Sequence, residues 1–217
     1  MAIKIALAGN PNCGKTTMFN ALTGANQYVG NWPGVTVEKK EGKLKGKKGK
    51  GEDIIVTDLP GIYSLSPYTL EEVVSRDYVL KENPDVIIDL VDATNIERNL
   101  YLTTQLIETG VPVVIALNMA DLLEKRGIKI DTKRLSMLLD CPIIETSALR
   151  GEGLDKLIDE AVKVAKSSKV DLPKEIFSKD MEAAIVEVKG VLPTSVTDDK
   201  KRWYAVKFLE NDEKVKE

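Results

Sequence analysis

Gly9-Asn10-Pro11-Asn12-Cys13-Gly14-Lys15-Thr16 is the stretch that decides the fold of this chain. It has the GxxxxGK[ST] spacing of a phosphate-binding loop. It directly follows the apolar run Ile3–Ala8 and leads into a segment with helical spacing. A loop between a strand and a helix can direct several backbone N–H groups and a helix N-terminus at negatively charged oxygens. We therefore predict that this chain binds the phosphates of a nucleotide.

Individual side chains of the loop have separate predicted roles. Lys15 can reach the β- and γ-phosphates as a positive charge, and the hydroxyl group of Thr16 is placed to bind Mg²⁺. The glycines allow the backbone to fold closely around the phosphates. The residues predicted to contact the nucleotide here are Gly9, Asn10, Pro11, Asn12, Cys13, Gly14, Lys15, Thr16 and Thr17.

Composition excludes several classes of protein. The formal net charge of −3 over 217 residues gives no sign of a nucleic-acid-binding protein. With two cysteines and no histidine, a disulfide framework and a structural zinc site are both disfavoured. The apolar runs are short, as in strands, rather than long enough to span a membrane. We expect a soluble chain in a reducing, cytosolic setting.

Short apolar runs alternate with segments of helical spacing. The predicted strands are Ile3–Ala8, Ile54–Thr57, Val86–Val91, Val113–Leu117 and Pro142–Glu145. The predicted helices are Lys15–Leu22, Leu70–Lys81, Ile96–Thr109, Thr132–Leu139 and Leu154–Lys166. This order is typical of an α/β fold with a mostly parallel, twisted sheet and helices on both faces. In such folds ligands bind at the carboxyl ends of the strands.

The pattern changes after Lys166. A polar connector, 167–173, ends in a proline and precedes two helix-like pieces, Glu175–Lys189 and Lys200–Leu209. We predict a nucleotide-binding domain at 1–170 and a short C-terminal helical extension at 171–217. The two pieces are too short for a core of their own, so they either pack on the first domain or begin a larger helical unit.

The segment Lys39–Lys50 is rich in lysine and glycine. One interpretation is a surface that faces phosphates or a membrane. The other is a solvated β-hairpin whose lysines protect an edge strand.

A second set of motifs follows the phosphate loop in the order typical of GTPases. Asp58-Leu59-Pro60-Gly61 comes directly after a predicted strand and has the form DxxG. Its aspartate can hold Mg²⁺ through water, and the backbone amide of Gly61 can sense the γ-phosphate. Thr36 is the candidate threonine that would complete the Mg²⁺ shell when a triphosphate is bound.

Two further motifs indicate guanine. Asn118-Met119-Ala120-Asp121 has the form NKxD with methionine in place of lysine, and Thr146-Ser147-Ala148 matches the last guanine element. Asp121 can accept hydrogen bonds from both N1–H and N2–H of guanine, a donor pair that adenine lacks. A buried carboxylate left unpaired can discriminate by about 10⁴-fold or more. The predicted base-binding residues are Asn118, Met119, Asp121, Ser147 and Ala148.

With these motifs the chain resembles the amino-terminal cytosolic G-domain of the FeoB family of ferrous-iron transporters, a group of Ras-like P-loop GTPases. The resemblance lies in GNPNCGKTTMFN at 9–20, NWPGVTVE at 31–38, DLPGIYSLS at 58–66 and NMAD at 118–121. RWYAVKFLE at 202–210 is similar to the helical extension of that family, so the resemblance covers almost the whole chain.

The resemblance implies a domain that binds GTP and GDP with Mg²⁺, hydrolyses GTP and regulates or powers Fe²⁺ uptake from the cytoplasmic side of the cell membrane. Its implied partner is a transmembrane iron-permease region of the same polypeptide. A small cytosolic regulator and a homo-oligomer are further candidates, and no nucleic acid is expected. The family usually has serine at the position of Cys13, which suggests sensitivity to oxidation here.

The residues predicted to act in hydrolysis are Lys15, Asn12, Thr36 and Gly61. Ile62 stands where Ras-like enzymes have a glutamine that orients water, so we expect slow hydrolysis. Asn12 matches an asparagine that binds K⁺ in cation-stimulated relatives, or it only stabilises the turn of the loop. Trp32 lies in the first predicted switch loop, Ala25–Thr36, and is expected to be partly exposed. It could dock on a partner in one nucleotide state or be buried against the domain in the other.

Two other functions compete with this interpretation. A soluble GTPase of ribosome or tRNA maturation would share the generic motifs, but it predicts an RNA-binding module that residues 170–217 do not provide. A scaffold that binds nucleotide without hydrolysing it is favoured by Ile62. It is opposed by Lys15, Thr16 and Asp58, which are all present.

Overall fold

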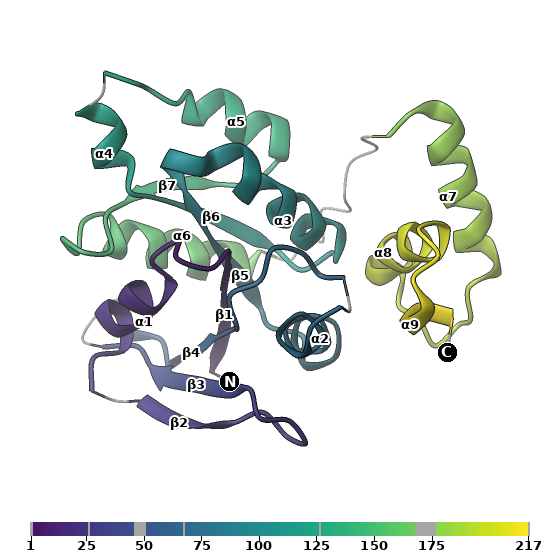
Figure 1. Cartoon of the computed structure of the whole chain (residues 1–217), viewed down its shortest axis with the longest axis horizontal. Coiled ribbons are helices and arrows are strands. Elements are labelled where there is room, and N and C mark those ends of the chain that lie inside the picture. The colour runs from purple at the N-terminus through teal and green to yellow at the C-terminus, as the bar shows by residue number, and fades with distance from the viewer. Residues whose placement is uncertain are drawn as a thin grey trace.

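The computed structural model describes residues 2–25, 27–45, 51–66, 68–125, 127–167 and 177–216. They form a seven-stranded sheet with helices on both faces and a separate group of helices at the C-terminus (Figure 1). The predicted α/β class is therefore confirmed. The predicted domain boundary near residue 170 lies outside the described residues and stays a prediction. No helix among the described residues is both long enough and apolar enough to cross a bilayer.

The sheet has the strand order β2-β3-β4-β1-β5-β6-β7, in which β4, β1, β5, β6 and β7 are parallel. The bounds are β1 Ile3–Gly9, β2 Gln27–Asn31, β3 Glu38–Lys43, β4 Ile54–Asp58, β5 Val86–Asp92, β6 Val113–Asn118 and β7 Ile143–Thr146. The five parallel strands correspond to the five predicted ones. Their carboxyl ends meet at one edge, where the phosphate loop follows β1.

The antiparallel strands β2 and β3 correct two sequence predictions. The segment 25–36 was expected to be a loop, but Gln27–Asn31 is a strand that pairs with β3. Lysines 39, 40 and 43 lie on β3, which is flanked by both β2 and β4 and so is not an edge strand. Residues 46–50 of the lysine-rich segment lie outside the described residues. The strand β3 overlaps the predicted hairpin, whereas β2 was missed because its apolar content is low.

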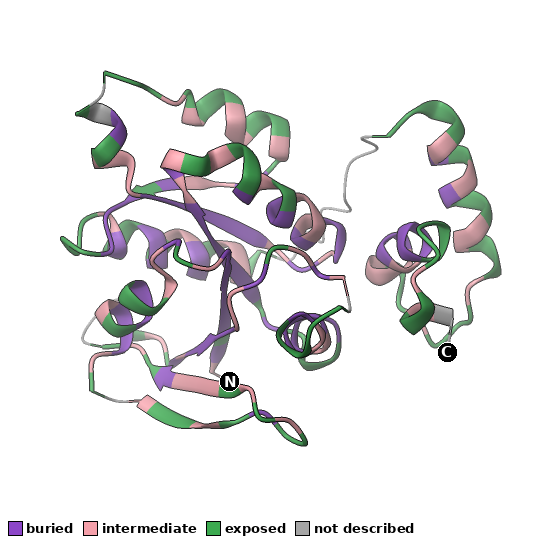
Figure 2. Cartoon of the chain, viewed as in Figure 1, coloured by how far each residue is buried: buried purple, intermediate pink, exposed green. Residues whose placement is uncertain are grey.

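Different helices cover the two faces of the sheet, and alternate side chains of β1 point to one face or the other. Ile5 and Leu7 face a cluster formed with α1 and α6, whereas Ala6 and Ala8 face a cluster formed with α2 and α3. Figure 2 shows that the central strands are buried on both sides. The helices of this part are α1 Lys15–Thr23, α2 Leu70–Asp77, α3 Ile96–Glu108, α4 Ala120–Glu124, α5 Thr132–Leu139 and α6 Leu154–Lys166. A π-helix, η2 (Tyr78–Glu82), continues α2, and a short 3₁₀ turn, η3 (Ala93–Asn95), precedes α3.

The C-terminal helices α7 (Lys179–Val191), α8 (Asp198–Leu209) and α9 (Glu213–Lys216) form a small unit beside α2 and α3 (Figure 1). Its apolar cluster is small and centres on Ile185, Ala205 and Val206. Charged residues connect it to the sheet domain. Arg202 on α8 donates to Glu108 of α3 at 2.8 Å and, through two nitrogens, to Glu182 of α7 at 2.6 and 2.9 Å.

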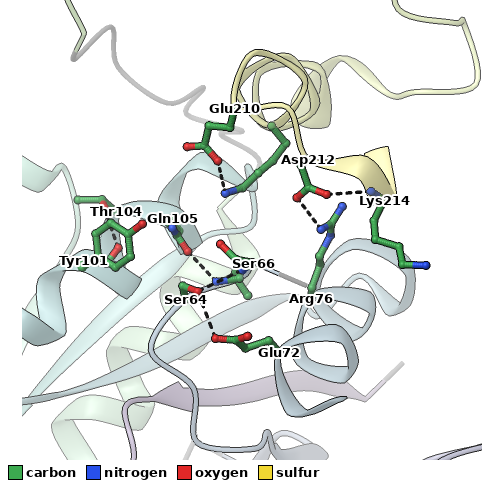
Figure 3. Close-up of polar contacts among 12 residues, drawn as sticks. Ser64, Ser66, Glu72, Arg76, Tyr101, Thr104, Gln105, Glu210, Asp212 and Lys214 are labelled. Atoms are coloured by element: carbon green, nitrogen blue, oxygen red, sulfur yellow. Dashed lines mark hydrogen bonds and ion pairs between the residues drawn. The ribbon is translucent and has the colours of Figure 1, made fainter. Parts of the chain in front are cut away.

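A second buried ion pair lies nearby. Nη1 of Arg76, on α2, donates to Oδ2 of Asp212 at 2.8 Å (Figure 3). The guanidinium of Arg76 lies 4.7 Å from the ring centre of Trp203. Trp203 is 1% exposed. Burial raises the pKa of Glu108, and the neighbouring Arg202 opposes that shift. The helical unit is thus attached through desolvated charges, each of which needs its partner.

Asp89 is the most deeply buried carboxyl group of the sheet. It lies on β5, is 1% exposed and accepts a hydrogen bond from the hydroxyl of Thr103 at 2.5 Å. Burial raises its pKa from 3.8 to about 6, and the hydrogen bond opposes the shift only in part. The folded protein therefore binds a proton at Asp89 more tightly than the unfolded chain does.

Replacement of Arg202 should loosen the helical unit. We expect Arg202→Ala to lower the free energy of unfolding by about 3–5 kcal/mol, because two buried carboxylates lose their guanidinium partner. Hydrogen exchange in α7 and α8, together with urea unfolding, measures the effect. The control is Lys201→Ala, which removes an ion pair to the exposed Asp198 and should leave the free energy of unfolding nearly unchanged. Equal protection of α7 and α8 in both variants would contradict the role given to Arg202.

Asp89→Asn should stabilise the protein above pH 6. Below about pH 4, Asp89 is protonated in both the folded and the unfolded state, so it costs no stability. Above the folded-state pKa of about 6 it is ionised in both states, and its burial then lowers the free energy of unfolding by the full amount. A shift from 3.8 to about 6 corresponds to roughly 3 kcal/mol at pH 8. Urea unfolding at pH 4 and pH 8 tests this, with the exposed Asp159→Asn as control. A gain that is the same at both pH values would rule out titration of Asp89 as the cause.

Candidate nucleotide-binding site

The phosphate loop occupies the turn between β1 and α1. A Cβ atom on Gly9 would lie 2.7 Å from the carbonyl oxygen of Leu90, and one on Gly14 would lie 2.5 Å from Nδ2 of Asn118. Gly14 also has a φ of 93°, which favours glycine. Asn12, at the turn, has a φ of 66° and is exposed. Side chains at the two glycines would therefore force the surrounding strands apart.

Lys15 and Asp58 form the central ion pair of the site. Lys15 Nζ donates to Asp58 Oδ1 at 2.7 Å, and the two side chains are 10% and 6% exposed. Asp58 ends β4, and Lys15 begins α1. Burial raises the pKa of Asp58, while the positive charge of Lys15 opposes the shift. The structure thus brings together the two residues that the sequence predicted for phosphate and Mg²⁺ binding.

The segment after Asp58 packs directly on the phosphate loop. The backbone N–H of Ile62 donates to the carbonyl of Gly9 at 3.3 Å, and a Cβ on Gly61 would lie 3.2 Å from Cα of Pro11. Ile62 is 3% exposed and belongs to the apolar core. Its side chain therefore packs inside the domain and has no group that could orient a water molecule.

Two residues further along this segment, Ser64 and Leu65, are hydrogen-bonded to α2 and α3. The backbone N–H of Leu65 donates to Gln105 at 2.6 Å, and Ser64 donates to Glu72 at 3.2 Å (Figure 3). Glu72 also forms a capping box with Thr69, which starts α2. The loop therefore connects the phosphate site with α2, the helix that carries Arg76.

Thr36 and Trp32 lie on the loop between β2 and β3. Thr36 is exposed, and no hydrogen bond joins it to Lys15 at the start of α1 or to Asp58 at the end of β4 among the described residues. Trp32 was expected to be partly exposed, but only 8% of it is accessible. Its ring packs edge-on against Tyr78 at 5.4 Å, with Lys39 Nζ 5.1 Å from its centre. The structure thus has Trp32 buried against the domain, which was one of the two alternatives. Its partner Tyr78 comes from the π-helix, far along the chain, and provides an apolar surface that the local sequence does not reveal.

Asn118 connects the two halves of the site. Its Nδ2 donates to the carbonyl of Cys13 at 2.9 Å, and its Oδ1 accepts from the backbone N–H of Ala148 at 3.0 Å. The side chain is thus bonded to both the phosphate loop and the loop after β7. Met119 has a φ of 63°, and its Cε lies 3.6 Å from the position of a Cβ on Gly14. This methionine, in the place of the usual lysine, therefore lies beside the phosphate loop.

Asp121 lies in the first turn of α4 and is paired with a residue that the sequence analysis missed. Nη2 of Arg150 lies 3.2 Å from Asp121 Oδ2. Arg150 follows Thr146-Ser147-Ala148 by two positions, on a loop closed by two backbone hydrogen bonds between Ser147 and Glu152. The signal that could have revealed it is its place directly after a guanine motif.

The remaining predicted contacts fit the same edge of the sheet. Thr16 and Thr17 lie in the first turn of α1 and are exposed. Asn10 is 3% exposed, and its side-chain oxygen and nitrogen have no hydrogen-bond partner among the described residues. The backbone of the phosphate loop leaves no room for a Cβ at Gly9 or Gly14 and so forms a cradle, with hydroxyl and carboxylate oxygens beside it. Such an arrangement suits phosphates and a hard cation such as Mg²⁺.

Cys13 lies within this cradle but is chemically protected. It is 1% exposed, and burial raises the pKa of its thiol to about 12. The thiolate is the reactive form of cysteine. The oxidation sensitivity suggested by the sequence is therefore not supported by the structure.

Comparisons with known proteins agree with this geometry. The model of the family described as "Ferrous iron transport protein B" matches residues 3–161, and the model described as "FeoB cytosolic helical domain" matches residues 177–217. Among curated relatives, an Fe(2+) transporter FeoB of Shigella flexneri is 41% identical over 214 residues, which cover 97% of this chain and 27% of the relative. An Fe(2+) transport protein A/Fe(2+) transporter FeoB fusion protein of Porphyromonas gingivalis is 44% identical over 222 residues, which cover 98% of this chain and 26% of the relative. The chain thus spans about a quarter of the length of these relatives.

Solved structures with similar folds are also related in sequence. The cytosolic domain of a T. maritima FeoB iron transporter in apo form has a TM-score of 0.90 and 39% identity, covering 100% of this chain and 84% of that chain. A mutant of S. thermophilus NFeoB bound to GDP has a TM-score of 0.93 and 51% identity, covering 99% and 81%. The alternative of a GTPase in ribosome or tRNA maturation is not supported, because the matching models and relatives are ferrous-iron transport proteins.

Proposed function

The chain belongs to the family of ferrous iron transport protein B, and we propose that it binds GTP and GDP and slowly hydrolyses GTP. The observation that carries this proposal is the convergence of four motifs at one edge of the sheet. They are the phosphate loop, the segment 58–61, the segment 118–121 and the segment 146–148. Similar structures bound to GDP and to GMPPNP support a guanine nucleotide as the ligand.

The proposed contacts divide the nucleotide between three groups of residues. The phosphates lie on the backbone of 9–14 and on Lys15, and the base lies between Met119, Asp121 and Ala148. Mg²⁺, which would neutralise charge on the phosphates, is held by Thr16, by Asp58 through water, and by Thr36 when a triphosphate is present. Further contacts come from Thr17, Gly61, Asn118 and Ser147.

Binding exchanges the partners of one ion pair. Lys15 now bonds to Asp58 at 2.7 Å. Phosphate oxygens can replace the carboxylate as the partner of Lys15, and Asp58 is then available to the water shell of Mg²⁺. Because each charge gains a new partner as it loses the old one, neither is left buried and unpaired.

Hydrolysis is expected to be slow because Ile62 is buried and apolar. Without a residue that orients water, the rate should be on the order of 10⁻³ to 10⁻² s⁻¹. A K⁺ ion held by the side-chain oxygen of Asn12 would stabilise the charge that develops on the phosphates, as an arginine finger does elsewhere. The exposure of Asn12 at the turn of the loop suits this role. The competing role, stabilisation of the turn, rests on its φ of 66°.

Release of the γ-phosphate removes a partner from both Thr36 and Gly61. The two segments that respond are 25–36 and 62–69. The second leads into α2, and α2 is paired with the helical unit through Arg76 and Asp212. A change of nucleotide at the site could therefore alter the position of the C-terminal helices through a chain of residues that contact one another.

The wider role follows from the relatives and is part of the proposal. They are Fe(2+) transporters of which this chain spans about a quarter, so the remaining length can hold a transmembrane iron-permease region. We place this domain on the cytoplasmic side of the membrane, where GTP regulates or powers Fe²⁺ uptake. A small cytosolic regulator and a homo-oligomer remain candidate partners.

The base specificity is tested by turnover of radiolabelled GTP and ATP. GTP should be hydrolysed at the slow rate given above, and ATP should be hydrolysed much more slowly, because adenine lacks the two N–H donors that Asp121 would accept from guanine in place of Arg150. Asp121→Ala should reduce this preference. Comparable turnover of both nucleotides by the unmodified chain would contradict the proposal.

The cation mechanism is tested by GTP turnover in KCl and in NaCl at equal ionic strength. We expect K⁺ to raise the rate by roughly tenfold or more, and Asn12→Ala to abolish this stimulation while nucleotide binding is nearly unchanged. Asn12→Gly separates the two roles of this residue, because glycine adopts the same positive φ without a side chain. Full stimulation in Asn12→Gly would show that Asn12 serves the turn and not the cation.

A further inference from the structure

The pair between Arg150 and Asp121 joins two loops of the base site. Arg150 Nη2 lies 3.2 Å from Asp121 Oδ2, with the arginine side chain 47% and the aspartate side chain 21% exposed. The loop that carries Arg150 is closed by reciprocal backbone hydrogen bonds between Ser147 and Glu152 at 3.1 Å. The arginine is thus held beside the carboxylate that is proposed to recognise guanine.

The chemistry of the two ligands of this carboxylate is alike. The N1–C2–N2 edge of guanine is a guanidine fragment that presents two N–H donors side by side, as the guanidinium of arginine does. A carboxylate accepts such a fork through its two oxygens. Arg150 lies at Oδ2, one of the two oxygens that a bound guanine would use, so the side chain and the base compete for that oxygen.

We propose that Arg150 is an internal competitor of guanine, which holds Asp121 until a guanine nucleotide displaces it. This inference rests on the proposed function, because it takes Asp121 as the residue that recognises the base. Arg150 is then a residue that sets the affinity and association rate of the nucleotide. It is not a catalytic residue.

The partial exposure of the pair limits the size of the effect. Partly exposed ion pairs contribute little free energy. About one half to one fifth of the protein molecules should therefore have Asp121 free of Arg150 at any time. Nη1 of Arg150 also lies 4.0 Å from Glu152 Oε1, so a displaced arginine keeps an acidic neighbour. Because the competition precedes binding, it should slow association and leave dissociation unchanged.

The test is stopped-flow binding of fluorescently labelled GDP to the chain. Arg150→Ala should bind labelled GDP about two- to fivefold faster, with an unchanged dissociation rate and an affinity that is higher by the same factor. This advantage should shrink at high ionic strength, because the pair that it removes is screened by salt. The matched control is Lys163→Ala, which removes a surface ion pair with Glu160 on α6 and the same unit of charge.

Two results would overturn the inference. Unchanged association of Arg150→Ala would show that the pair does not compete with the base, and faster dissociation would show that Arg150 instead covers the bound nucleotide. The proposed function itself would fail differently, since the unmodified chain would then not bind GDP.

A second background tests whether the effect runs through Asp121. Asp121→Asn replaces an acceptor by an amide donor, which matches the C2 carbonyl of xanthine. In this background, Arg150→Ala should leave the association of labelled xanthosine diphosphate unchanged, because the carboxylate that Arg150 occupied is gone. A two- to fivefold acceleration there as well would exclude competition at Asp121 as the cause.

Discussion

The buried side-chain amide of Asn118 is the contact on which the geometry of the site depends. It donates to the carbonyl of Cys13 and accepts from the N–H of Ala148, so a single residue at the end of β6 fixes the distance between the phosphate loop and the loop after β7. Both bonds are buried, where a lost partner is costly. Glycine at position 14 is required by the same contact, because a Cβ there would collide with the amide.

Two acidic residues of the site are each paired with a cation of the same chain. Lys15 holds Asp58 on the phosphate side, and Arg150 holds Asp121 on the base side. The first pair is buried and the second is partly exposed, so the two differ in strength. Binding of a nucleotide would exchange partners at both ends of the site. Phosphate oxygens would replace Asp58 at Lys15, and the neutral guanine edge would replace Arg150 at Asp121.

The helical unit is attached by a different kind of contact from those that build the sheet domain. Its own apolar cluster is small. The bond of Arg202 to Glu108 crosses to α3, whereas its bonds to Glu182 join the consecutive helices α7 and α8 within the unit. Arg76 makes a similar buried bond from α2. Desolvated ion pairs are sensitive to geometry. An interface of this kind can therefore respond to small movements of α2 and α3, whereas a large apolar interface would tolerate them.

The parallel strands, most helices and the position of the site could be predicted from the sequence, because apolar periodicity and fixed motif spacing are local properties. The strand β2 was missed because its apolar content is low. The contact of Trp32 with Tyr78 and the pairing of Arg150 with Asp121 were missed because each joins segments that are distant along the chain. The residue types of the site could thus be predicted from the motifs. Which charges are paired and which side chains are buried could not be predicted in the same way, because both depend on segments that come together only in the folded chain.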